Sequence, residues 1–307
     1  MKKLFDSIVH NGFEKYEIIF VDDFSGDQSV EIARQYKSLI IHNKENKGPA
    51  YCRNKGAQIA KGEVLLFCDS DITIDKGSLS KINQHFVQDK IDAMIGCPTY
   101  PPLHDNWVGN YRTIEIRSCL RTGNLKEESL RLWSSTLGAI RKDLFLDLGG
   151  FNEEYKGPDI EDFELYLRFP KEAKVIVDED VMYHHLYKSH LDVIVKAFRR
   201  SFFLGNLRFG QKGNVYLDDK HRKISIVFAL FIWLTVGVSL KIPMLSYSII
   251  FCLFLKIYHD RLMLQKSFRL KGLFFVVYTF LFSCLMAIPV LFGFLSGKSF
   301  KIICPKS

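Results

Sequence analysis

Two aspartates, Asp69 and Asp71, follow the apolar run 64–67 almost directly. An uninterrupted apolar run of this length is typical of a strand buried on both faces of a parallel sheet. Ligands of open α/β sheets bind at the carboxyl ends of the strands, so a ligand is expected at these aspartates. Alternate residues of an extended segment point the same way, and a pair of carboxylates suits Mg²⁺ or Mn²⁺. The alternative is an acidic turn that only ends a strand.

The segments before this strand alternate between strand and helix patterns. The spacing predicts helices near 2–11, 29–36 and 49–60, and strands at 16–21 and 38–42. Asp22 and Asp23 follow the first of these strands, so carboxylates again stand at a strand's carboxyl end. The β-α-β-α-β order predicts an α/β domain with a mostly parallel sheet covered by helices.

The C-terminal third of the 307-residue chain has a different composition. No charged residue occurs in 224–240, 242–255 or 272–297. The third run is long enough to span a bilayer of roughly 30 Å, and the first two are near the lower limit of about 17 residues. We therefore expect a soluble domain followed by a C-terminal transmembrane helical segment with two to three membrane helices.

The formal net charge of +8 comes largely from basic residues beside these apolar runs, at 220–223 and 256–271. Basic residues in such positions mark the cytoplasmic side, which predicts a multi-pass protein of the cytoplasmic membrane with its soluble domain in the cytosol. Charge alone does not indicate nucleic-acid binding. A transporter is disfavoured because the apolar runs lack acids, and a dinucleotide oxidoreductase because no G-x-G-x-x-G turn follows an early strand.

Three motifs occur in order along the first 71 residues: Val21-Asp22-Asp23-x-Ser25-x-Asp27, Asn46-x-Gly48-x-x-x-Cys52-Arg53-Asn54-x-Gly56, and Phe67-x-Asp69-x-Asp71. Together they resemble the nucleotide-binding half of the family-2 glycosyltransferases, which have a GT-A fold. The resemblance implies that Asp22 or Asp23 contacts the nucleotide base and that Arg53 lies near the donor site. It also implies that Asp69 and Asp71 hold the ribose and the metal-diphosphate. A surface ion pair is the alternative for Arg53.

A later segment resembles the family's acceptor side. A G-G-F-x-E turn at 149–153 precedes Glu161-Asp162, and Arg168 completes an E-D-x-x-L-x-x-R element. The resemblance implies that Asp162 is the general base, with Glu161 beside it on the acceptor side or in a supporting role. Acids also favour the start of a helix, so helix capping is the alternative for both residues.

Two further groups have more than one interpretation. His184 and His185 follow a strand, and His185 is predicted as a third metal ligand; the alternative is one imidazole in solvent and one in a polar niche. Arg199 and Arg200 lie in an aromatic and basic segment that suits a helix at the membrane interface. They could bind lipid head groups, the phosphate of a carrier lipid or the acceptor, or serve in generic anchoring.

The sequence therefore predicts a catalytic domain over 1–190, an amphipathic interface region over 191–222 and a membrane domain over 223–307. Family members begin with a strand that precedes the helix near 2–11, so the resemblance predicts an N-terminally incomplete domain. The expected activity is that of an inverting glycosyltransferase of the hexosyltransferase type, with Mg²⁺ or Mn²⁺, a nucleotide-sugar donor and a lipid-linked or glycan acceptor. The alternatives are a polyprenyl-phosphate sugar synthase and an inactive membrane scaffold.

Overall fold

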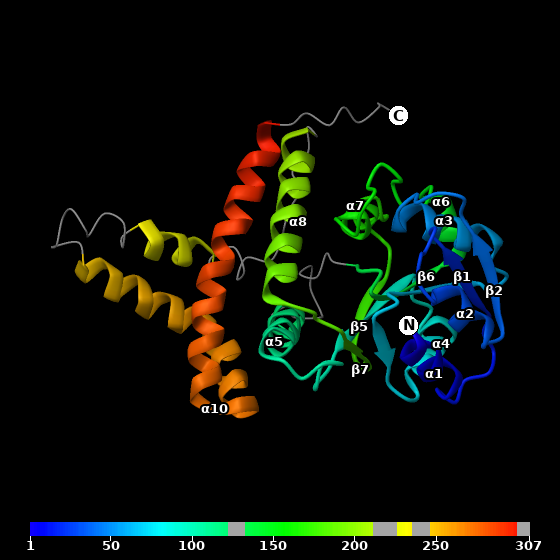
Figure 1. Ribbon diagram of the computed structural model, residues 1–307, viewed down its shortest axis with the longest axis horizontal. Helices are drawn as coiled ribbons and strands as arrows, with labels where there is room; N and C mark the ends of the chain where they lie inside the picture. The colour runs from blue at the N-terminus through cyan, green and yellow to red at the C-terminus, as the bar shows by residue number, and fades with distance from the viewer. Residues whose placement is uncertain (122–132, 211–225, 235–245, 300–307) are drawn as a thin grey trace. The chain divides into compact units, whose positions relative to one another are not determined.

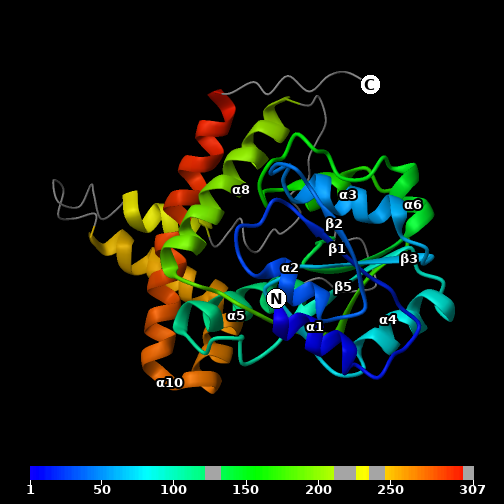
Figure 2. The same ribbon diagram turned by 45° about the vertical axis from the view of Figure 1, so that its right-hand side comes forward.

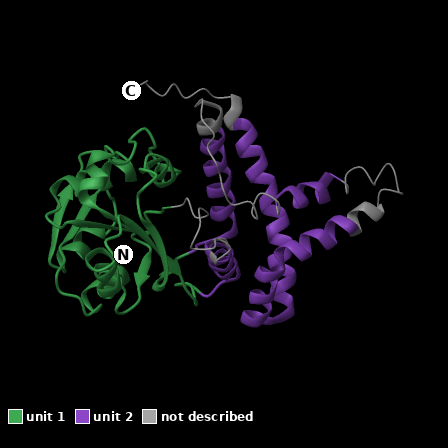
Figure 3. Ribbon diagram, turned by 180° about the vertical axis from the view of Figure 1, so that it is seen from behind, with its two compact units in different colours: residues 1–104, 131–186 green, residues 105–130, 187–307 purple. Residues whose placement is uncertain are grey.

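The computed structural model describes residues 1–121, 133–210, 226–234 and 246–299. The chain forms two compact units (Figure 3). The first comprises Met1–His104 with Arg131–Leu186, and the second comprises Asp105–Leu130 with Tyr187–Ser307. All strands in the described ranges belong to the first unit, whereas the described secondary structure of the second is helical.

The first unit begins with the predicted alternation of helices and strands. Its elements are α1 (Lys2–Val9), β1 (Ile18–Asp22), α2 (Ser29–Arg34), β2 (Ser38–His42) and α3 (Pro49–Ile59). β1 and β2 pair in parallel from Ile18 opposite Ser38 to Asp22 opposite His42, and they form a two-stranded sheet. Pro49 occupies the first turn of α3, where its missing N–H leaves no helical hydrogen bond unmade.

The rest of the first unit surrounds a five-stranded sheet. Its elements are β3 (Val64–Cys68), β4 (Ile72–Ile74), α4 (Ser78–Val87), β5 (Ala93–Pro98), β6 (Leu137–Arg141), α6 (Lys142–Asp147), α7 (Glu161–Leu167) and β7 (Val175–His185). The strand order is β3-β6-β5-β7-β4, and only the β5–β7 pair is parallel. The predicted α/β class is therefore confirmed, but the expectation of a mostly parallel sheet was wrong. An apolar run reports the burial of a strand and not its direction.

Both faces of the sheet are covered (Figures 1 and 2). α1 and α4 lie on one side, and α3 and α6 lie on the other. Leu66 packs against the cluster that contains Leu4 and Ile82, whereas the next residue, Phe67, contacts the rings of Phe145 and Phe151 on the opposite face. Successive side chains of a strand point to opposite faces, so β3 is buried from both sides as its apolar sequence predicts.

The second unit contains α5 (Trp107–Arg121), α8 (His190–Gly210), a helical segment at 226–234 and α10 (Ser246–Ser299). α10 is broken at Gly272, whose φ of 77° is not helical. α8 packs closely along α10, because a Cβ on Gly205 would lie 2.4 Å from the Phe294 carbonyl oxygen. A Cβ on Gly293 would likewise lie 2.3 Å from the carbonyl oxygen of Phe198. Glycine at these positions therefore allows the close approach.

One helix within the described ranges, Phe251–Ser296, is long and apolar enough to cross a membrane. The basic segment 256–271, which separates the second and third apolar runs, is itself helical. Of the first predicted span, only 226–234 lies inside the described residues, and the second is described from 246 onward. A single such helix is weak evidence for membrane association and does not support the predicted multi-pass topology.

Candidate active site

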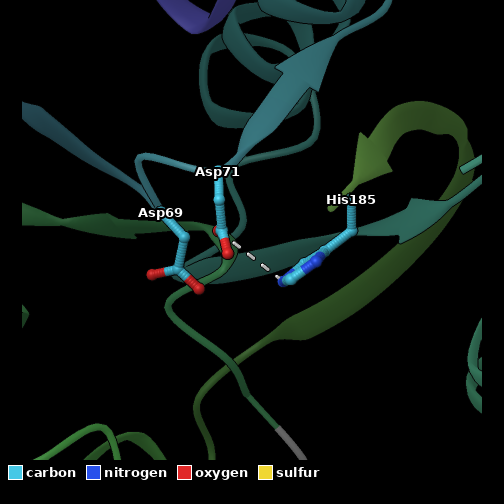
Figure 4. A group of neighbouring side chains, drawn as sticks. All are labelled: Asp69, Asp71 and His185. Atoms are coloured by element: carbon cyan, nitrogen blue, oxygen red, sulfur yellow. Dashed lines mark ion pairs between the residues drawn. The ribbon is translucent and has the colours of Figure 1, made fainter. Parts of the chain in front are cut away.

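The two aspartates of the D-x-D motif and one histidine converge at the end of β3. One ligand atom from each of Asp69, Asp71 and His185 lies within 4.8 Å of the others (Figure 4). The strand register explains this, since β4 pairs with β7 so that Ile72 lies opposite His185. The aspartates just before β4 are therefore placed beside the last residue of β7. The Nε2 atom of His185 is 3.8 Å from an Asp71 carboxylate oxygen.

The chemistry of this donor set suits Mg²⁺ or Mn²⁺. The Nδ1 atom of His185 lies 2.9 Å from the Leu186 carbonyl oxygen, a contact that favours a proton on Nδ1. Nε2 then keeps its lone pair on the side of Asp71, as a metal ligand must. His184 points elsewhere, since its Nε2 lies 3.0 Å from Asp75 and its Nδ1 lies 2.5 Å from the Pro101 carbonyl oxygen.

Arg53 connects this cluster to the start of α7. Its Nη2 donates to Asp69 at 2.9 Å, and its Nη1 donates to Glu161 at 2.8 Å. Glu161 is only 3% exposed, and its Oε2 atom is buried with no hydrogen-bond partner among the described residues. Burial and the neighbouring Asp162 raise the pKa of Glu161, and Arg53 opposes this rise. Arg53 thus joins residues that are far apart in the sequence rather than forming a local surface ion pair.

Asp162 lies in the first turn of α7, next to Glu161. Its Oδ1 accepts the Phe163 N–H at 2.8 Å, and its Oδ2 lies 3.4 Å from the backbone nitrogen of Ser135. The N-cap residue of α7, Ile160, makes no side-chain cap, and both acids lie in the first turn, where the alternative interpretation also places them. The contact with Ser135 was not foreseen, because no sequence signal relates the end of the segment before β6 to α7.

Asp23 organises the loop that leads into α3. Its carboxylate accepts the backbone N–H groups of Lys47 and Gly48, each at 2.8 Å, and the side-chain amide of Asn43 at 2.9 Å. Burial raises the pKa of Asp23, but these hydrogen bonds outweigh it and lower the pKa overall. Asp22 is 5% exposed and accepts the Ser25 N–H at 3.2 Å. The Asp23 carboxylate therefore holds the loop before α3, whereas the Asp22 carboxylate bonds the turn at Ser25.

The remaining motif residues brace the acceptor-side turn. The Asn54 side-chain amide accepts the Phe151 N–H at 2.8 Å and donates to the Phe151 carbonyl at 2.9 Å. Arg168 donates to the Gly150 carbonyl at 2.7 Å and to Glu164. Sequence reasoning assigned no role to Asn54 or Arg168, although both belong to the motifs. Arg199 and Arg200 lie on α8 of the second unit with exposed side chains.

The chain resembles known proteins in sequence and in fold. The model of "Glycosyl transferase family 2" matches residues 1–149. Residues 1–149 therefore have the sequence pattern of family 2. The chain is 28% identical over 174 residues to an uncharacterized glycosyltransferase of Haemophilus influenzae, and the match covers 55% of this chain and 57% of the relative. It is 38% identical over 99 residues to the poly(ribitol-phosphate) β-glucosyltransferase of Bacillus spizizenii, covering 30% of this chain and 16% of the relative.

The fold of the chain resembles that of a solved structure. A mannosyltransferase from Pyrobaculum calidifontis, in complex with GDP-Man and Mn²⁺, matches with a TM-score of 0.56 at 14% identity. The match covers 95% of this chain and 81% of the mannosyltransferase. The predicted GT-A fold class is therefore confirmed. The chain spans little more than half the length of the first curated relative, and less of the second.

Proposed function

We propose that this glycosyltransferase moves a hexosyl group from a nucleotide-diphosphate sugar to a membrane-associated acceptor, with inversion at the anomeric carbon. The observation that carries the proposal is the convergence of Asp69, Asp71 and His185, which Arg53 links to the helix that bears Asp162. Arg53 thus connects the candidate metal ligands to the helix that bears the candidate base. The GDP-Man and Mn²⁺ of the matching mannosyltransferase are in keeping with such a donor and metal.

The donor half of the proposed site lies at strand ends. Asp22 or Asp23, at the end of β1, contacts the nucleotide base, and Asp69 and Asp71, after β3, hold the ribose and the metal-diphosphate. Asp69, Asp71 and His185 would hold Mg²⁺ or Mn²⁺, and the bound cation would neutralise the charge of the departing diphosphate. Arg53 is a fixed positive charge beside the same carboxylates, held by its two hydrogen bonds.

The acceptor half of the proposed site centres on Asp162. Its carboxylate takes the proton from the attacking sugar hydroxyl as the new bond forms. The Ser135 backbone nitrogen and the Phe163 N–H hold that carboxylate in place. A base distinct from the metal-binding aspartates favours a single displacement over a covalent intermediate. Glu161 supports this arrangement through Arg53.

We further propose that α10 attaches the enzyme to the cytoplasmic membrane with the first unit in the cytosol. The apolar stretch Phe251–Ser296 supports membrane attachment. A lipid-linked glycan or polysaccharide precursor would be reached at that surface, where Arg199 and Arg200 could contact the acceptor. The name of the Bacillus spizizenii relative, a poly(ribitol-phosphate) β-glucosyltransferase, favours a polymeric acceptor.

Nucleotide binding tests the proposed site directly. The binding of UDP and GDP to the full purified chain would be measured by calorimetry with and without Mn²⁺. We expect Asp71→Asn and His185→Gln to abolish the Mn²⁺-dependent part of the affinity. His184→Gln is the matched control, because this neighbour faces Asp75 and Pro101 instead of the cluster. Wild-type affinity and Mn²⁺ dependence in the Asp71→Asn variant would refute the site.

A further inference from the structure

A groove of about 490 Å³ lies in the second unit around the break of α10 at Gly272. Ile257, Arg261, Gln265 and Arg269 line it from the helix before the break. These residues are four positions apart, so they form a single row along one helix face. Leu273, which follows the break, adds an apolar wall. The groove therefore combines a row of hydrogen-bond donors with hydrocarbon.

The charge of the groove is positive, since its lining includes two arginines and no acidic residue. The Arg261 guanidinium lies 4.5 Å from the centre of the Tyr258 ring and donates to the Tyr258 carbonyl at 3.0 Å. These contacts fix its direction and leave most of its five donors available. Arg269 is exposed and makes no hydrogen bond or ion pair within the described ranges. Guanidinium groups in such a setting favour a phosphate, which they bind through paired N–H donors.

The other basic side chains of this helix are already engaged inside the second unit. Lys256 is fully buried and pairs with Asp260. Lys271 lies 2.7 Å from an Asp105 carboxylate oxygen. Lys266 is more weakly held, with its Nζ 3.5 Å from the Ser118 hydroxyl. Two of these lysines are thus compensated by carboxylates, whereas Arg261 and Arg269 make no ion pair within the described ranges.

The apolar walls of the groove indicate that the rest of the ligand is hydrocarbon. Phe268 is 57% exposed and Leu273 is 66% exposed, so water-facing hydrocarbon stands beside the arginines. Arg261 and Arg269 are about 12 Å apart along the helix, and both guanidinium groups belong to the same row of groove residues. We propose that the groove binds an anionic phospholipid of the membrane. The phosphate-bearing head group binds at the arginines, and the acyl chains lie along Phe268 and Leu273.

This inference rests on the proposed membrane attachment and adds a lipid preference to it. The test uses the full chain with vesicles of phosphatidylcholine alone or with added phosphatidylglycerol. The groove variant is Arg261→Gln with Arg269→Gln. The matched control is Lys188→Gln with Lys196→Gln, which removes the same charge from exposed positions of the same unit that have no proposed ligand. We expect the phosphatidylglycerol-dependent gain in partitioning to fall about tenfold more in the groove variant than in the control.

A second measurement counts bound lipid without a bilayer. In native mass spectrometry of the detergent-solubilised chain, the wild type and the control should retain phosphatidylglycerol over phosphatidylcholine, and the groove variant should not. Equal losses in the two double variants would mean diffuse attraction and would overturn the site. Equal partitioning of the wild type to both vesicles would overturn the site while leaving membrane attachment intact. No partitioning to either vesicle would overturn both.

Discussion

Substitution of Arg53 by methionine tests whether the link between the D-x-D cluster and α7 also stabilises the first unit. The change removes the only side-chain partner of the Glu161 carboxyl among the described residues, and the Glu161 side chain is 4% exposed. Removal of one partner of a buried ion pair costs about 3–5 kcal/mol. We expect about 3 kcal/mol for Arg53→Met, because Glu161 can take up a proton and so avoid a buried charge.

Because Glu161 can take up a proton, the loss of unfolding free energy in Arg53→Met depends on pH. The pKa of Glu161 is raised in the folded chain by burial and by Asp162, and removal of Arg53 raises it further. Below the ordinary carboxyl pKa, Glu161 is protonated in both the folded and the unfolded chain, so its burial has little cost. As pH rises through the raised folded pKa, deprotonation favours the unfolded chain. The deficit of Arg53→Met should therefore be larger at pH 8 than at pH 5.

The assay needs a probe that reports the first unit alone. Trp133 is fully buried there, and the other two tryptophans, Trp107 and Trp233, belong to the second unit. In a Trp107→Phe, Trp233→Phe background, Trp133 fluorescence would follow urea unfolding. Glu161→Gln added to Arg53→Met should recover most of the lost free energy, because it removes the unpaired charge. A deficit that is equal at both pH values and that Glu161→Gln leaves unchanged would refute the reasoning.

Three further predictions concern other parts of the chain. Asp162→Asn should lower kcat for sugar transfer by about 100-fold or more while UDP or GDP affinity is unchanged; wild-type kcat would exclude it as the base. The carboxylates of Asp89 and Asp178 hydrogen-bond the two ring nitrogens of His85 and raise its pKa against the effect of burial. His85→Gln should therefore lower the free energy of unfolding in urea by about 1 kcal/mol at pH 6 and by less at pH 8. Equal losses at the two pH values would contradict this. Gly293→Ala should lower the thermal midpoint of the second unit, followed by Trp233 fluorescence, because a Cβ would lie 2.3 Å from a carbonyl oxygen of α8; an unchanged midpoint would argue against the close contact.

The sequence predicted the short-range features of the first unit well. Apolar runs indicated β1, β2 and β3, and the D-x-D motif indicated a cluster that His185 does join. The links made by Arg53 and Asn54 could not be predicted from spacing, since their partners lie 108 and 97 residues away. Side-chain contacts of that kind depend on where the sheet places each strand end, and a one-dimensional pattern does not contain the strand order.

The basic segment at 256–271 shows why the second unit was harder to predict. Basic side chains between apolar runs indicate a loop when each is assumed to face water. Lys256 instead lies buried against Asp260, and Lys271 pairs with Asp105 on a different segment of the same unit. Such pairing removes the need for solvent, so the helix continues to the break at Gly272. A count of charges in the sequence cannot distinguish paired from solvated lysines.

The charge at the candidate site constrains the order in which ligands bind. Three carboxyl groups, those of Asp69, Glu161 and Asp162, act on the single guanidinium of Arg53, and Asp71 lies beside Asp69. Arg53 already pairs with two of them, so little positive charge is left for a diphosphate, which would meet net repulsion in a partly buried site. A divalent cation held by Asp69, Asp71 and His185 would reverse this balance at the point where the diphosphate binds. We therefore expect the metal to bind before or with the donor, and free nucleotide to bind weakly without it.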